Sequence, residues 1–378
     1  MIASVIVTLI ATDLFLYYFT HYRYAITKLD YPRFYFVKDP ELGTDISLNF
    51  ATSTHYFEDA AFPVWSNNLG CFDTNYDGET PYIYMTGDSL AWGFSPFDDT
   101  WGKKVETFAG IRTVKCGVTG GYGTKQELLR TSRHLSKLPA PNLIIVEYTQ
   151  VNDFDEDANF PINTVHDGYL VPNLAKGGVT ESQAEEKYAL FDKYCTIEPS
   201  LYPIISRTRC FFSNHSVLYN LFRKRIRDVL VSVFPHSALE NIGLIAPNRP
   251  IPEAKTDIEW EKHLNNILGF KKLAEEKNSK LLFVLYLTPG DKTTEKLKLF
   301  LNENGIVYLD LSQIFEKYSK AKPLIWKLNG HWNIAGNHIV GLMVSKFIIE
   351  NDLVGISDKT ERIDIINAQI EKEFGNIF

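Results

Sequence analysis

From residue 81 onward, short apolar runs alternate with longer stretches in which apolar positions recur at helical spacing. The runs predict strands and the longer stretches predict helices. Predicted strands cover 81–86, 111–116, 142–148, 280–287 and 305–309, and predicted helices lie near 99–109, 124–136, 256–277, 292–303 and 335–350. This alternation is typical of an α/β protein whose parallel sheet is covered on both faces. Right-handed crossovers then predict a three-layer α/β/α sandwich with a flavodoxin-like sheet.

The alternation divides the chain after residue 22 into an N-terminal extension, an alternating domain with an insertion, and a C-terminal tail. Residues 23–80 are loop-rich and predict an N-terminal extension, while the alternating domain spans 81–355. Within it, residues 155–255 break the pattern with prolines, glycines and aromatic residues. A structureless loop of that length is improbable in a compact domain, so we expect a folded lid or subdomain with a helix near 217–231. Residues 356–378 form a C-terminal tail whose apolar positions fit a short final helix.

The first 22 residues are a separate case. Residues 2–19 are apolar apart from Ser, Thr and Asp13, and their length predicts an uncleaved transmembrane anchor over 1–22. A carboxylate at mid-span is costly, so a buried helix and a cleaved signal peptide remain alternatives. Basic residues that follow the span favour a cytoplasmic body.

Charge and cysteine content limit the partners. The 378-residue chain has a formal net charge of −7 and no long basic cluster, which argues against nucleic acid. No Cys or His cluster has zinc-site spacing, and nothing calls for a metal or an organic cofactor. Cys116 ends a predicted strand and is expected to be a buried small hydrophobe. Cys195 and Cys210 flank one loop of the insertion and are a candidate disulfide in an oxidising compartment.

Candidate chemistry gathers where predicted strands end. Residues 87–90 read Gly-Asp-Ser-Leu, and a serine in a tight glycine turn after a strand is where an α/β protein presents a nucleophile. Ser89, Gly120 and Asn152 each follow a predicted strand, and the carboxyl ends of parallel strands share one edge of the sheet. His331 precedes the last helix of the domain and is the candidate general base.

The blocks 87–90, 117–123, 150–153 and 329–333 carry Ser, Gly, Asn and His in this order. In this they resemble the SGNH hydrolases, also called the GDSL family, over roughly residues 75 to 350. The resemblance implies the SGNH hydrolase fold, with Ser89 as nucleophile and His331 as base. It also implies an oxyanion hole made by the backbone N–H groups of Ser89 and Gly120 and the side-chain amide of Asn152. Glycine allows close approach of the backbone to a substrate, and asparagine offers an N–H that a carboxylate lacks.

One position departs from the family pattern, which has an aspartate shortly before the histidine. Here that residue is Asn329, which can accept a hydrogen bond from the imidazole but brings no charge. Three readings stay open: a Ser–His dyad oriented by Asn329 or a backbone carbonyl, substitution by Asp310, or weak or lost catalysis. Nearby, Asn333 is expected to cap the last helix and Asp153 to accept a structural hydrogen bond.

Residues 330–333 resemble the His block of bacterial glycan O-acetyltransferases and acetylesterases with this fold. The expected function is therefore a serine esterase or O-acyltransferase that acts outside the cytoplasm, through an acyl-enzyme, on an acyl ester of a glycan. A candidate partner is a membrane-bound acyltransferase. Hydrolysis and transfer share the acyl-enzyme, so the sequence does not separate them. The hypothesis from another class is a catalytically silent binding or scaffold protein, which Asn329, the insertion and the anchor would fit.

Overall fold

The computed structural model describes residues 2–20, 31–57, 59–150, 152–159, 161–173, 257–288, 290–327 and 329–375, with short pieces between 208 and 233. Its central sheet contains all five predicted strands. They are Tyr82–Thr86 (β5), Arg112–Lys115 (β6), Leu143–Thr149 (β7), Lys280–Tyr286 (β10) and Val307–Asp310 (β11). Every pairing between them is parallel.

The strand order is β6-β5-β7-β10-β11, with β5, β7 and β10 inside the sheet. Numbered by appearance in the chain, this is 2-1-3-4-5, the flavodoxin-like order. The predicted α/β architecture is therefore confirmed. The chain passes from β5 outward to β6 and then returns past β5 to β7, so the order of strands across the sheet reverses between β5 and β7. A doubly wound sheet opens a crevice for a ligand at this point.

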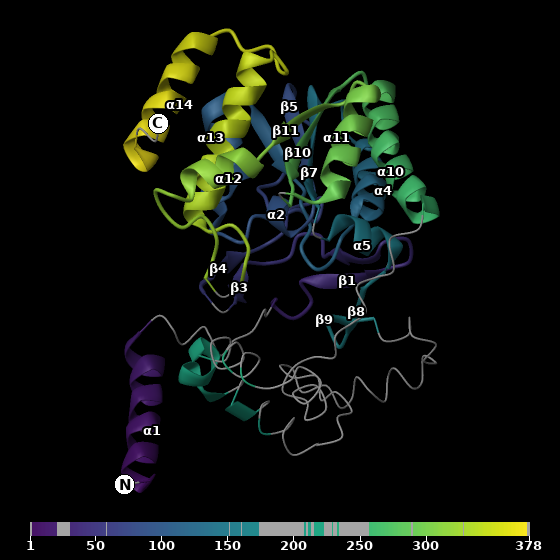
Figure 1. Cartoon of the computed structure of the whole chain (residues 1–378). Coiled ribbons are helices and arrows are strands. Elements are labelled where there is room, and N and C mark those ends of the chain that lie inside the picture. Colours follow the sequence, from purple (N-terminus) through teal and green to yellow (C-terminus); the bar gives the residue numbers. More distant parts are fainter. Residues whose placement is uncertain are drawn as a thin grey trace.

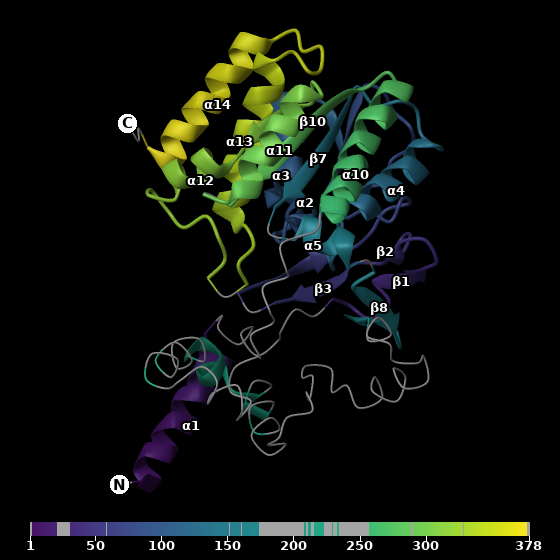
Figure 2. The same ribbon diagram turned by 45° about the vertical axis from the view of Figure 1, so that its right-hand side comes forward.

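Helices cover both faces of the sheet, as Figures 1 and 2 show. One face packs against Trp101–Ala109 (α3), Ser312–Tyr318 (α12) and Ile334–Glu350 (α13), and Lys359–Phe374 (α14) packs on α13 and α3. The other packs against Thr124–Leu135 (α4), Asp257–Glu276 (α10) and Lys292–Glu303 (α11). Every residue of β5 and β7 is buried, which explains their apolar runs without alternation. All five predicted helices and the tail helix α14 are confirmed, whereas α12 was not predicted.

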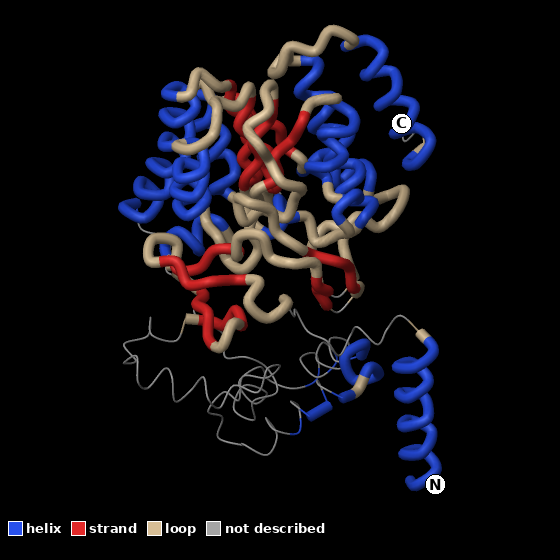
Figure 3. Tube along the Cα trace, turned by 180° about the vertical axis from the view of Figure 1, so that it is seen from behind, coloured by secondary structure: helices blue, strands red, loops and turns tan. Residues whose placement is uncertain are grey.

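The N-terminal extension forms two antiparallel hairpins. The first pairs Phe36–Asp39 (β1) with Gly43–Ile46 (β2), and the second pairs Ser53–Tyr56 (β3) with Ala61–Val64 (β4). Their aromatic residues form a third buried cluster, which includes Trp92 and Phe94 just after the Ser89 turn. Figure 3 shows the hairpins below one end of the central sheet.

A further hairpin comes from the start of the predicted insertion. Asn163–His166 (β8) pairs with Tyr169–Pro172 (β9) and packs on β1 and β2. A backbone hydrogen bond of 2.7 Å from Phe34 to Gly168 ties the two segments together. Most of residues 174–256, with Cys195, Cys210 and most of the helix expected near 217–231, lie outside the described residues.

The prediction of a transmembrane anchor over residues 1–22 is not supported. The segment does form a helix, Ile2–Phe19 (α1), but no helix in the described part of the chain is long and apolar enough to cross a membrane. The hydroxyl side chains of Thr8 and Thr12 and the carboxylate of Asp13 interrupt its apolar character. The Asp13 carboxylate accepts a hydrogen bond of 2.8 Å from the backbone N–H of Leu218.

The interpretation of Cys116 was wrong in one respect. The residue is buried at the end of β6, as expected, but its sulfur forms a disulfide with Cys71. The two cysteines are 45 residues apart, and only the packing of the loop at 67–73 against the end of β6 brings them together. His134 lies near both sulfurs. Because sulfurs in a disulfide offer no thiolate to a metal, we infer no metal site there.

Candidate active site

Ser89 is presented by a turn that only glycine allows. Gly87 follows β5 with φ of +141°, and a Cβ atom there would lie 2.7 Å from the Cβ atoms of Ala91 and Glu147. Asp88 then caps the short helix Ser89–Trp92 (α2) by accepting the N–H of Leu90 at 2.8 Å. This places Ser89 in the first turn of the helix, beyond the carboxyl end of the strand.

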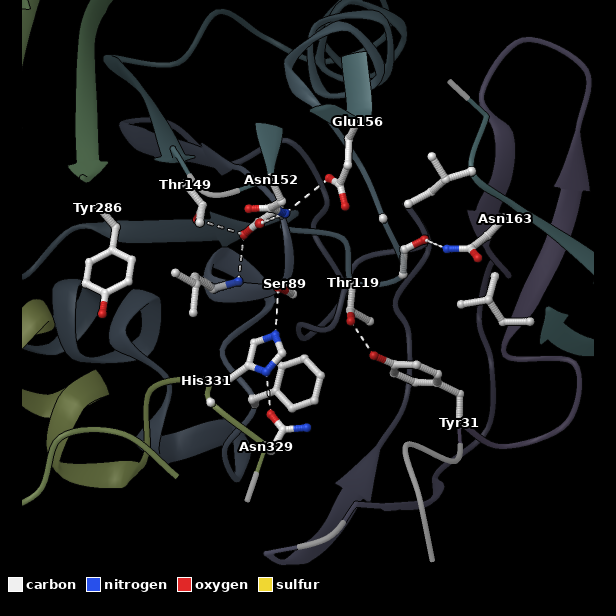
Figure 4. Close-up of a pocket in the computed structure, with 18 residues that line it drawn as sticks. Tyr31, Ser89, Thr119, Thr149, Asn152, Glu156, Asn163, Tyr286, Asn329 and His331 are labelled. Carbon is white, nitrogen blue, oxygen red and sulfur yellow. Dashed lines mark hydrogen bonds between the residues drawn. The ribbon is translucent and has the colours of Figure 1, made fainter. Parts of the chain in front are cut away.

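The structure brings Ser89 together with Asn329 and His331, which lie far from it in the sequence (Figure 4). His331 Nε2 lies 2.8 Å from Ser89 Oγ, and the side-chain oxygen of Asn329 is hydrogen-bonded to His331 Nδ1. The ring of Phe94 stacks on the imidazole with centroids 3.8 Å apart. The histidine is therefore held through both nitrogens and one ring face.

This arrangement selects the state of the imidazole that a base requires. The Asn329 oxygen only accepts hydrogen bonds, so the proton resides on Nδ1 and the Nε2 lone pair faces the serine hydroxyl. Burial lowers the pKa of His331 to about 4, with the nearby charge of Asp88 opposing the shift. The histidine is therefore neutral at pH 7, as a general base must be.

Asp310 does not replace the missing aspartate. Its carboxylate forms an ion pair of 2.6 Å with Lys298 and accepts the backbone N–H of Ser312 at 2.8 Å. The partner of His331 Nδ1 is Asn329. The reading in which Asp310 substitutes is therefore wrong, and the geometry favours a dyad oriented by a neutral amide.

Gly120 stands where the predicted oxyanion donor should be. It lines the same cavity as Ser89, with φ of +95°, and a Cβ atom there would lie 2.7 Å from Leu170 of β9. Its carbonyl accepts a hydrogen bond of 2.6 Å from Asn163, while no acceptor among the described residues takes its N–H. The N–H is thus available to a ligand, and its role as an oxyanion donor stays a prediction.

Asn152 also lies beside Ser89, but its amide is engaged. The Nδ2 group donates to Asp88 Oδ2 at 2.7 Å and to Glu156 Oε2 at 3.1 Å. The carboxylate of Asp88 requires the NH₂ rather than the oxygen on that side, and Glu156 accepts the second hydrogen. Both hydrogens of the amide are therefore used, and donation to an oxyanion requires one of these bonds to open.

The cavity around these residues has a volume of about 570 Å³. Apolar side chains form part of its wall, namely Leu90, Phe94, Ile162, Leu170 and Tyr286. Polar groups form the rest, including Tyr31, Thr119, Asn163 and Glu156 (Figure 4). The cavity suits a ligand with one apolar part and one part rich in hydrogen-bonding groups.

A cluster of buried carboxyl side chains beneath the site was not predicted as a cluster from the sequence. Burial, reinforced by neighbouring acids, raises the pKa of Glu127, Glu147 and Asp153 well above the usual range. One available signal was Glu147, an acid within an otherwise largely apolar strand. Asp153 also accepts the N–H of Thr149 at 2.7 Å, the structural role predicted for it.

Glu156 was not predicted as a site residue either, and it lines the cavity itself. It belongs to the unpredicted helix Asp153–Ala158 (α5). Burial, and then the charge of Asp88, raises the pKa of the Glu156 carboxyl to about 8. At the other end of the site, Asn333 caps α13 by accepting the N–H of Gly336 at 2.9 Å, as predicted.

No protein-family model matches this sequence, and no curated protein matches it. Solved structures do resemble the fold. A protein assigned to the lipolytic G-D-S-L family from Desulfitobacterium hafniense DCB-2 is 12% identical, over 71% of this chain and 99% of its own, with a TM-score of 0.37. A G-D-S-L family member from Veillonella parvula DSM 2008 is 9% identical, over 69% and 94%, with a TM-score of 0.35.

A lipase/acylhydrolase from Enterococcus faecalis is 12% identical, over 71% of this chain and 95% of its own, with a TM-score of 0.32. Two of these three structures are thus described as lipolytic proteins of the G-D-S-L family and the third as a lipase/acylhydrolase. With these identities and scores, nothing about the chemistry of this chain follows from the likeness itself.

Proposed function

We propose that this protein is a serine hydrolase that cleaves carboxylic esters through an acyl-enzyme on Ser89. One observation carries the proposal: Ser89 Oγ lies 2.8 Å from Nε2 of a histidine whose other nitrogen is held by Asn329. A nucleophile bonded to a base, with the base oriented by a third group, is the arrangement that activates a hydroxyl. The low pKa of His331 keeps that base unprotonated at pH 7.

The reaction has two stages. Ser89 Oγ attacks the ester carbonyl carbon and gives its proton to His331 Nε2. The tetrahedral intermediate then collapses, breaking the bond to the alcohol oxygen, which leaves with that proton. In the second stage a water molecule gives a proton to His331 and attacks the acyl carbon, the Ser89 ester bond breaks, and the serine recovers the proton.

The substrate that we propose is an acyl ester of a glycan or another hydroxylated alcohol. The mixed lining of the cavity supports this choice, because Thr119, Asn163 and Glu156 offer partners to hydroxyl groups while Ile162 and Leu170 offer an apolar surface. If a sugar hydroxyl replaces water in the second stage, the same site transfers the acyl group instead of hydrolysing it.

A place outside the cytoplasm belongs to the same proposal. The Cys71–Cys116 disulfide supports it, because disulfides persist in oxidising compartments and are rare in the cytosol. A membrane-bound acyltransferase remains a candidate partner there, as donor of the acyl group in the transfer reaction.

The first test is covalent labelling of the full-length protein with a fluorophosphonate, read by intact mass. We expect one adduct on the wild type and none on Ser89→Ala, because only an activated hydroxyl displaces the fluoride. Acetyl esters should then be hydrolysed by the wild type, and Ser89→Ala should lose essentially all of this activity. A folded wild-type sample that takes no adduct would instead favour the silent binding or scaffold protein.

Asn329→Asp should raise the phosphonylation rate about fivefold. A hydrogen bond to a charged acceptor is stronger than one to a neutral amide by about 1 kcal/mol, and the gain appears as positive charge develops on His331. The carboxylate should also raise the pKa of His331, moving the acid limb of the pH–rate profile upward. A lower rate at every pH would contradict the idea that Asn329 orients the base in the way an aspartate does.

A further inference from the structure

We propose that Glu156 is a positioning residue that holds the side-chain amide of Asn152 away from the oxyanion, and that it releases the amide only when its carboxyl group is neutral. The consequence is an alkaline limit on the activity of the site. This inference rests on the proposed function, because it concerns the donor that would stabilise the oxyanion formed at Ser89.

Both hydrogens of the Asn152 amide are already used in hydrogen bonds. The amide of Asn152 has two N–H bonds, and they point to Asp88 Oδ2 at 2.7 Å and to Glu156 Oε2 at 3.1 Å. An oxyanion at Ser89 would need one of them. The predicted oxyanion hole is therefore incomplete as it stands, with the N–H of Gly120 available and the side-chain donor occupied.

Of the two hydrogen bonds of the Asn152 amide, the one to Glu156 is the easier to open. Asp88 is 2% exposed and also accepts the N–H of Leu90 at 2.8 Å and the hydroxyl of Thr149 at 3.4 Å. Glu156 makes the longer bond to the amide and lines the cavity, where its carboxyl can turn toward a ligand. The Asp88 bond therefore anchors the amide, and the Glu156 bond is the one exchanged for the oxyanion.

The charged side chains around Glu156 are mostly acidic. Asp88 lies before α2, Asp155 and Asp157 lie on α5 itself, and Glu127 faces the same region from α4. The imidazole of His263 on α10 contacts Asp157, as does the backbone N–H of Lys125 on α4. Among the described residues no cation contacts the Glu156 carboxyl directly, and such an acidic surrounding favours the neutral carboxyl, in agreement with a pKa of about 8.

The state of Glu156 then controls the cost of forming the oxyanion. When Glu156 is ionised, its charge-assisted bond to the amide must break, and the oxyanion develops beside a second negative charge. When Glu156 is neutral, the bond that breaks is weaker and the added repulsion is absent. Reactivity should therefore fall as the pH rises through the pKa of Glu156, by up to about tenfold for each pH unit.

The kinetic test measures the rate of phosphonylation of the full-length protein between about pH 5 and pH 10. The phosphoryl oxygen of the probe occupies the place of the oxyanion. We expect the wild-type rate to fall above about pH 8, and Glu156→Gln to remove this fall because the glutamine stays neutral. Asp155→Asn is the matched control: it removes the same charge from the neighbouring residue of α5 and should keep the alkaline limb. An alkaline limb that persists in Glu156→Gln would overturn the proposal.

A second measurement does not depend on activity. The side-chain ¹⁵N resonance of Asn152, assigned through its loss in Asn152→Asp, should titrate near pH 8 in the wild type and stay constant in Glu156→Gln. A pH-independent resonance in the wild type would overturn the proposal. A resonance that titrates in a protein that takes no fluorophosphonate would support the coupling of Glu156 to Asn152 while showing that the proposed hydrolase function fails.

Discussion

Replacing His331 by glutamine should slow the phosphonylation of Ser89 by about 10²- to 10⁴-fold, the usual contribution of a general base. His331 Nε2 contacts the serine hydroxyl directly at 2.8 Å. Glutamine can occupy a similar volume and even hydrogen-bond to the hydroxyl, but it cannot accept a proton at neutral pH. The variant should therefore retain the fold and lose the rate, which separates the chemical role of the residue from a structural one.

The pKa of His331 also predicts the direction in which the phosphonylation rate changes with pH. Burial lowers the pKa of His331 to about 4, so the base is unprotonated above that pH and becomes protonated below it. On the acid side, the wild-type rate should accordingly fall only below about pH 4, and this acid limb should be absent from the residual rate of His331→Gln. His338→Gln is the control, because His338 lies on α13 and pairs with Glu373 at 3.3 Å, away from Ser89. Equal losses in both variants would contradict the assignment of His331 as the base.

Replacing Arg130 by methionine should destabilise the protein by about 3–5 kcal/mol, the usual cost of breaking a buried ion pair from one side. The Arg130 side chain is 1% exposed and contacts three segments. It donates to the Asp45 carboxylate at 2.7 Å, to the carbonyl of Cys116 at 2.7 Å and to the carbonyl of Gly70 at 2.8 Å. Methionine would fill the space and leave all three acceptors without this donor.

Arg133→Met, one turn further along α4, is the matched control. Arg133 pairs with Asp39 and Glu41, but its side chain is 30% exposed, so its loss should cost no more than about 1 kcal/mol. Urea unfolding of both variants, compared through the midpoint and slope of each transition, checks the difference. Similar losses would mean that Arg130 is not what locks the N-terminal extension and the disulfide loop to α4.

The sequence predicts an element of the fold when the hydrophobic pattern of that element is visible within its own residues. The strands β5, β7 and β10 are largely apolar runs because both faces of the sheet are covered, and that pattern is visible in five to seven residues. The helix α12 escaped prediction because it is only seven residues long and starts two residues after β11.

The candidate site, too, could be predicted from the sequence only in part. Ser89, Gly120 and Asn152 follow strands that are parallel neighbours, so their gathering at one sheet edge follows from topology. The direction of each side chain does not. Whether Asn329 or Asp310 faces His331, and that the amide of Asn152 lies between two carboxylates, depend on side-chain positions that no periodicity encodes.

The sequence by itself determined the order of strands and helices, the layered architecture and the set of polar residues at the sheet edge, because each of these depends on burial patterns within one element. Only the tertiary structure decided the Cys71–Cys116 disulfide, the contacts of Arg130 and the link between Glu156 and Asn152. The first two join residues 14 to 85 positions apart, and the third joins residues whose helix, α5, the pattern did not predict. Such contacts depend on the distances and angles at which elements pack, and the spacing of residues along the chain does not specify these.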